Sequence, residues 1–145
     1  MKKKAIEYTL SCKKNDFNCI NIKSPEDSYE FSKKFYFDDI NIYESVFIIL
    51  VNRRMNTIGY AKISQGGISG SVVDIRIICK YAIESLCSGV ILVHNHPSGI
   101  LRPSKQDEEV ALNLKKALSM FDIKFIDSLI ISDSDYYSFV DNGLI

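Results

Sequence analysis

GVILVHNHPSGILRPSKQD, residues 89–107, is the most informative stretch of this chain. Its first part, residues 89–93, is apolar and short, which predicts a buried strand. The only two histidines of the chain, His94 and His96, follow directly. Residues i and i+2 of a strand point to the same face, so the two imidazoles are expected to leave the strand side by side. A helix is predicted to begin at Ser104, with Asp107 in its first turn.

Strand and helix patterns alternate on both sides of this stretch. Strands are predicted at 5–12, 44–51, 57–64, 89–95, 124–132 and 136–139, and helices from 25 to before 40, at 73–86 and at 104–120. The central strands are apolar on both faces, so helices are expected to cover both sides of the sheet. The fold class is therefore predicted to be α/β, with a mixed sheet flanked by helices. We expect one domain over 1–145, with an N-terminal edge strand and extension (1–24) and a core (25–145).

Composition narrows the classes of function. Eighteen basic and eighteen acidic residues cancel to zero net charge, which gives no support for binding nucleic acid or an anionic membrane. The longest apolar run is too short to cross a bilayer. The four cysteines form no CxxC pair, and no secretory leader is recognisable, so we expect a cytoplasmic protein with reduced thiols. The glycine-rich run 65–71 lacks the P-loop order and is expected to be a flexible connection or, less favoured, a loop that contacts substrate.

The histidine pair predicts a catalytic metal site. A catalytic zinc ion typically takes three protein ligands and keeps one position for water. His94, His96 and Asp107 are the predicted ligands of a Zn²⁺ ion. Glu44, at the head of a buried strand, is a candidate general base, and Ser104 could donate a hydrogen bond to the water or to the developing oxyanion. The alternatives are a helix cap for the pair Ser104 and Asp107, and a solvated carboxylate for Glu44.

Taken together, these residues resemble a known signature. Glu44, then His-x-His, seven residues, Ser, two residues and Asp resemble the JAMM motif of the JAB/MPN+ metallopeptidases. Within that superfamily, residues 94–107 resemble the bacterial RadC family, and the resemblance extends over about 25–145. It implies a JAB-type fold similar to that of cytidine deaminases. It also implies zinc held by His94, His96 and Asp107, water activation by Glu44, and assistance from Ser104 at the tetrahedral intermediate.

Two features depart from the family pattern. RadC proteins carry an N-terminal helix-hairpin-helix region that is absent from these 145 residues, so the resemblance transfers no DNA-binding role. Ser128 stands where the family usually has a histidine, which removes one imidazole from the strand at 124–132.

The function predicted from the sequence is a zinc-dependent metallopeptidase or isopeptidase-like hydrolase that acts on an unknown peptide or protein. Two alternatives are a metal-dependent nuclease and a DNA-repair accessory or interaction protein with a metal site. A structural zinc site is closed by four protein ligands, whereas only three are apparent here, which favours catalysis. Exposed apolar edges at 5–12 or 57–64 could pair into a homodimer.

Overall fold

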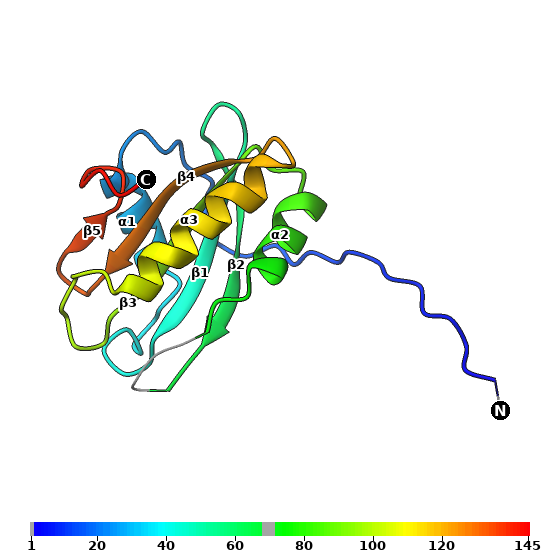
Figure 1. Cartoon of the computed structure of the whole chain (residues 1–145), viewed down its shortest axis with the longest axis horizontal. Coiled ribbons are helices and arrows are strands. Elements are labelled where there is room, and N and C mark those ends of the chain that lie inside the picture. The colour runs from blue at the N-terminus through cyan, green and yellow to red at the C-terminus, as the bar shows by residue number, and fades with distance from the viewer. Residues whose placement is uncertain (1, 68–71) are drawn as a thin grey trace.

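A five-stranded sheet with helices on both faces forms the centre of the computed structural model, which describes residues 2–67 and 72–145 (Figure 1). The strands are β1 (Ser45–Val51), β2 (Thr57–Gln65), β3 (Gly89–Asn95), β4 (Lys124–Ile131) and β5 (Tyr136–Ser138). The helices are α1 (Pro25–Lys33), α2 (Ile75–Glu84) and α3 (Lys105–Ser119). The strand order is β2-β1-β3-β4-β5. The pair β3–β4 is parallel and the other neighbours are antiparallel, so the predicted α/β class with a mixed sheet is confirmed.

The two central strands, β1 and β3, are buried at every position. One face of β1, with Phe47 and Ile49, belongs to the core formed with α1. The other face, with Val46 and Ile48, belongs to the core formed with α2 and α3. Both faces are apolar because both are covered, as the sequence pattern predicted.

The connection from β3 through α3 to the parallel strand β4 brings the start of α3 to the end of β3. Such parallel pairs need a crossover, and the helix packs back onto the sheet. Ala111, Leu114 and Leu118 are the fully buried side chains of α3. Phe121 is 54% exposed, because it lies beyond the last helical residue, Ser119.

The predicted strand at 5–12 is not present. In the described part of the chain before Asn21 there is no strand, and Figure 1 shows the first part of the chain, in dark blue, extending away from the body. The antiparallel bridge between Asn21 and Asn56 is isolated and lies outside the named strands. An alternating pattern needs a neighbouring strand, and this one has none.

The helix predicted from 25 to before 40 is shorter than expected, because α1 ends at Lys33. The remaining elements agree with the predicted ranges to within two residues at either end. The glycine-rich run predicted at 65–71 lies partly outside the described residues. Of the helices that are described, none has both the length and the hydrophobicity needed to cross a membrane.

The inner face of α3 gives a direct test of the packing. Leu114→Ala is expected to lower the free energy of unfolding by about 2–5 kcal/mol, because Leu114 is fully buried and its removal leaves a cavity. Leu112→Ala on the same helix is the control, since Leu112 is 47% exposed and its truncation should cost less than about 0.5 kcal/mol. Urea denaturation followed by circular dichroism measures both, and equal losses would contradict this orientation of α3.

Candidate metal centre

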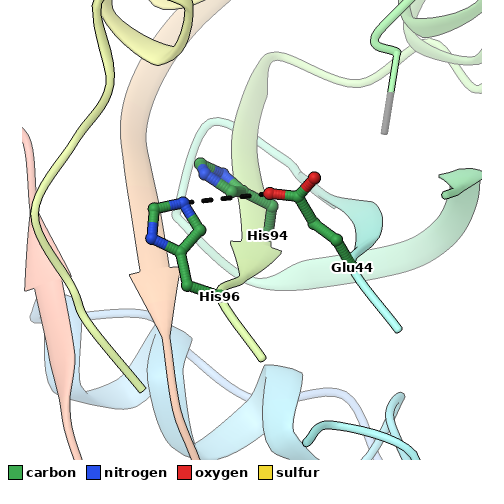
Figure 2. A group of neighbouring side chains, drawn as sticks. All are labelled: Glu44, His94 and His96. Carbon is green, nitrogen blue, oxygen red and sulfur yellow. Dashed lines mark ion pairs between the residues drawn. The ribbon is translucent and has the colours of Figure 1, made fainter. Parts of the chain in front are cut away.

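The candidate site lies where β1 begins and β3 ends. The antiparallel register pairs Val46 with His94, and one step of two residues further places Glu44 opposite His96. Side chains two residues apart share a face, so Glu44 and both imidazoles lie on the α3 side of the sheet. Figure 2 shows the Glu44 side chain pointing toward the two rings, which lie beside each other with centroids 5.0 Å apart.

The ring orientation of His96 is fixed by a backbone carbonyl. Its Nδ1 lies 2.7 Å from the Ile100 oxygen. A carbonyl oxygen can only accept, so Nδ1 is the protonated nitrogen and donates this hydrogen bond. Nε2 is thereby left as the atom that faces Asp107 and Glu44. A carbonyl that accepts from one ring nitrogen in this way orients a histidine for binding a metal through the other nitrogen and fixes its tautomer.

Asp107 forms a helix cap and contacts the histidines at the same time. The Ser104 amide donates to Asp107 Oδ2 at 2.8 Å, and the Asp107 amide donates to Ser104 Oγ at 3.1 Å, which completes a capping box. Asp107 Oδ1 lies 3.3 Å from His94 Nε2, and Oδ2 lies 3.5 Å from His96 Nε2. A carboxylate has about four acceptor positions, so capping and contact with the imidazoles coexist. The two roles that the sequence suggested for Asp107, helix cap and metal ligand, are therefore compatible.

The donor atoms suit a small cation. His94 Nε2 is buried and has no hydrogen-bond partner among the described residues, despite its proximity to Asp107. A buried polar atom left without a partner is costly, so such an atom calls for an explanation. Bonds of about 2.1 Å to a tetrahedral zinc ion separate its ligand atoms by about 3.4 Å. The Asp107 carboxylate lies at about that separation from both imidazole nitrogens, with Oδ1 3.3 Å from His94 Nε2 and Oδ2 3.5 Å from His96 Nε2.

A second carboxylate borders the same histidines. One donor atom each from Glu44, His94 and His96 lies within 4.8 Å of the others, so this group could also hold a metal ion. Glu44 Oε1 lies 3.8 Å from His96 Nε2, which is longer than a tetrahedral ligand separation. Glu44 thus belongs to a group of donor atoms that could hold a cation, whereas Asp107 contacts both imidazoles more closely, at 3.3 and 3.5 Å, through its two different oxygens.

Charge is shared between Asp107 and His96. Burial raises the pKa of Asp107, but the imidazoles of His94 and His96 outweigh it and hold that pKa well below the ordinary value. The Asp107 carboxylate in turn raises the pKa of His96, with smaller contributions from the Ile100 carbonyl and Glu44 against an opposing effect of burial. Without a cation, the site therefore favours an ion pair between ionised Asp107 and protonated His96. A metal ion would compete with the proton on His96.

The five candidate residues border one cavity of about 290 Å³. Ser104 Oγ accepts from the Asp107 amide, which leaves its own proton able to donate. The rest of the lining is neutral and mostly apolar. The lining residues are Glu44, Val46, Val73, Leu92, His94, His96, Ser104, Gln106, Asp107 and Val110.

Some polar contacts around the site had no signal in the sequence. Asn95 is the last residue of the strand predicted at 89–95, but nothing in the sequence indicated that its polar side chain is completely buried. The Ile100 carbonyl that holds His96 could not be predicted, because every residue has a carbonyl. Ser128, in place of the family's histidine, is a buried residue of β4.

Comparison with known proteins gives one consistent result. The model of the RadC-like JAB domain matches residues 22–144. A UPF0758 protein of Flavobacterium johnsoniae is 41% identical over 102 residues, which cover 70% of this chain and 44% of that protein. A UPF0758 protein of Syntrophomonas wolfei is 35% identical over 126 residues, which cover 86% of this chain and 54% of that protein. The chain thus spans about half the length of the curated relatives it matches.

The pairing of charges predicts a change in the titration of His96. In metal-free protein, Asp107→Asn is expected to lower the pKa of His96, because a neutral amide no longer stabilises the imidazolium. Glu44→Gln should lower it less, since Glu44 is farther from His96 and contributes least. NMR titration of the His96 ring carbons measures both shifts. An unchanged pKa in Asp107→Asn, or a larger decrease in Glu44→Gln, would contradict the arrangement.

Proposed function

This chain belongs to the RadC-like JAB domain family, and we propose that its cavity is the active site of a zinc-dependent hydrolase that cleaves amide bonds in a peptide or protein. The observation that carries the proposal is the convergence, beside a cavity, of two imidazole nitrogens and the Asp107 carboxylate, whose Oδ1 lies 3.3 Å from His94 Nε2 and whose Oδ2 lies 3.5 Å from His96 Nε2. Two nitrogens and one carboxylate oxygen are a donor set found in catalytic zinc sites.

We assign one role to each side chain around the ion. His94, His96 and Asp107 would hold the ion, and the Ile100 carbonyl would keep His96 in the tautomer that ligation requires. When bound, zinc lowers the pKa of a coordinated water to about 7 and polarises the carbonyl of the substrate. Glu44 would accept the proton of the attacking water and deliver it to the leaving amine. Ser104 would donate a hydrogen bond as negative charge develops on the carbonyl oxygen.

The lining of the cavity favours an amide over a phosphodiester. A phosphodiester is anionic, and its transfer is stabilised by Arg, Lys or metal clamps. The residues that border the cavity include two carboxylates and four aliphatic side chains, and among the described lining residues there is no lysine or arginine. Zero net charge gives no added attraction for nucleic acid. A neutral peptide segment therefore fits the site better than DNA or RNA, so we favour the hydrolase over the nuclease alternative.

A structural metal in an interaction protein is the other alternative, and Glu44 distinguishes the two. If Glu44 were a fourth ligand, the site would be closed to water, as structural zinc sites are. The 3.8 Å separation of Glu44 Oε1 from His96 Nε2 supports a carboxylate that lies beside the ion rather than on it.

The deciding variant is Glu44→Gln. We expect it to retain one zinc ion per chain and to lose at least about 10²-fold in hydrolysis, because glutamine is close in shape but accepts no proton. Metal content is measured by mass spectrometry of the purified protein. Hydrolysis is measured by incubating zinc-loaded protein with a proteome-derived peptide library and identifying new termini.

Glu109→Gln is the matched control, since Glu109 is an exposed carboxylate on α3 outside the cavity lining, and both measurements should equal those of the unchanged protein. His94→Ala should lose the metal. Loss of zinc from Glu44→Gln would make Glu44 a ligand and would overturn the catalytic assignment. New termini produced equally by Glu44→Gln would remove its role as a base.

A further inference from the structure

Asn95, the residue between the two histidines, has its side chain on the face of the sheet opposite the candidate metal site. Asn95 alternates with His94 and His96 along β3, so its side chain points away from the candidate metal site, toward the α1 face. It is completely buried. A buried amide must find hydrogen-bond partners, and the partners of Asn95 all lie in the segment 40–45, which contains Glu44.

The Asn95 amide makes three short hydrogen bonds. Its Nδ2 donates to the carbonyl of Ile40 at 2.6 Å and to the carbonyl of Tyr43 at 2.8 Å. Its Oδ1 accepts from the amide of Ser45 at 2.8 Å. Both donor protons and the acceptor oxygen are therefore engaged.

Two of these contacts lie on either side of Glu44. The Tyr43 carbonyl belongs to the peptide group before Glu44, and the Ser45 amide belongs to the peptide group after it. The Gly66 amide donates to the Glu44 carbonyl at 2.8 Å, which adds a second contact to the latter peptide group. Fixing both peptide planes fixes the φ and ψ angles of Glu44, and with them the direction of its Cα–Cβ bond.

We propose that Asn95 is the positioning residue that sets where the Glu44 carboxylate lies relative to the two histidines. Strand β3 is held between β1 and β4, so one rigid strand carries the imidazoles on one face and the anchor for Glu44 on the other. In this arrangement the backbone of one strand sets the distance between Glu44 Oε1 and His96 Nε2, which is 3.8 Å. The inference rests on the proposed function for the role of Glu44, but the tether itself does not need the metal.

The chemistry of asparagine suits this position. Aspartate would keep the acceptor for Ser45 but would lose both donors and would bury a charge. Glutamine is one methylene longer, which a site with no free space does not accommodate without strain. Threonine favours strands and keeps one hydroxyl, so Asn95→Thr is the mildest variant that breaks the tether.

The matched control is Tyr36→Phe. The Tyr36 hydroxyl, also buried, donates to the Ser45 carbonyl at 2.8 Å. Its removal deletes one buried hydrogen bond to the same segment without touching either peptide group beside Glu44. General loosening of the segment would appear in both variants, whereas loss of the tether would appear in Asn95→Thr alone.

The first measurement uses metal-free protein and is independent of the proposed function. Amide hydrogen exchange at Ser45, followed by NMR, is expected to be roughly tenfold faster in Asn95→Thr and nearly unchanged in Tyr36→Phe. Should Asn95→Thr fail to fold, Asn95→Ser is measured instead, since it introduces neither a charge nor a branched side chain at this buried position and lacks the Asn95 amide, and the same increase is expected at Ser45. Unchanged exchange would overturn the proposal.

The second measurement uses Co²⁺ as the probe. Co²⁺ affinity should change less than about threefold in Asn95→Thr, because His94, His96 and Asp107 remain. The pseudocontact shift of the Glu44 amide proton should change in Asn95→Thr and stay constant in Tyr36→Phe. An unchanged shift, or the same change in both variants, would overturn the positioning role. Absence of Co²⁺ binding in the unchanged protein would defeat the proposed function but leave the exchange result standing.

If hydrolysis is found, a double-mutant cycle completes the test. Asn95→Thr should lower kcat by up to about 10²-fold with little change in KM, since a misplaced base affects the chemical step more than binding. In the Glu44→Gln background the same substitution should have no further effect. Additive losses would show that Asn95 does not act through Glu44.

Discussion

The pairing of β1 with β3 is the contact on which the rest of this molecule depends. It is a buried antiparallel ladder at the centre of the sheet, with apolar side chains on both faces. Its register pairs Val46 with His94, and Glu44 and His96 lie two residues beyond that pair, just outside the two strands. Because the side-chain period of a strand is two, a slip of one residue would move both imidazoles to the wrong face. The core on each face resists that slip, so the same apolar residues that stabilise the sheet also align the candidate site.

The start of α3 supplies the other half of the site. Ser104 and Asp107 cap the helix, and the cap holds the Asp107 carboxylate where both imidazoles can reach it. Asp107 thus stabilises the helix end and contacts His96 through the same oxygen, Oδ2, while its Oδ1 faces His94. Removal of Asp107 would therefore alter both the helix end and the site, whereas Glu44 takes no part in a helix cap. This difference makes Glu44 the cleaner position for separating chemistry from folding.

The two faces of β3 carry different groups that contribute to the site. The α3 face carries the groups that would bind a cation, and the α1 face carries the buried Asn95 amide, which holds the segment before β1. A neutral amide can make these contacts without burying a charge. Because Asn95 is adjacent to both histidines in the chain, its hydrogen bonds beside Glu44 connect Glu44 to the backbone that carries the histidines.

Much of this structure follows from the sequence alone. The apolar runs predicted the central strands, the spacing of apolar residues predicted the helices, and the pattern from Glu44 to Asp107 indicated the site, because these signals are local and periodic. The prediction of a strand at 5–12 was wrong, because an alternating pattern forms a strand only where a neighbouring strand can pair with it. Tertiary structure alone decided that Asp107 both caps α3 and faces the imidazoles, and that Ile100 fixes His96. It also decided that Asn95 reaches the segment 40–45. Each of these depends on hydrogen bonds between residues brought together by the sheet, and backbone partners leave no trace in the side-chain pattern.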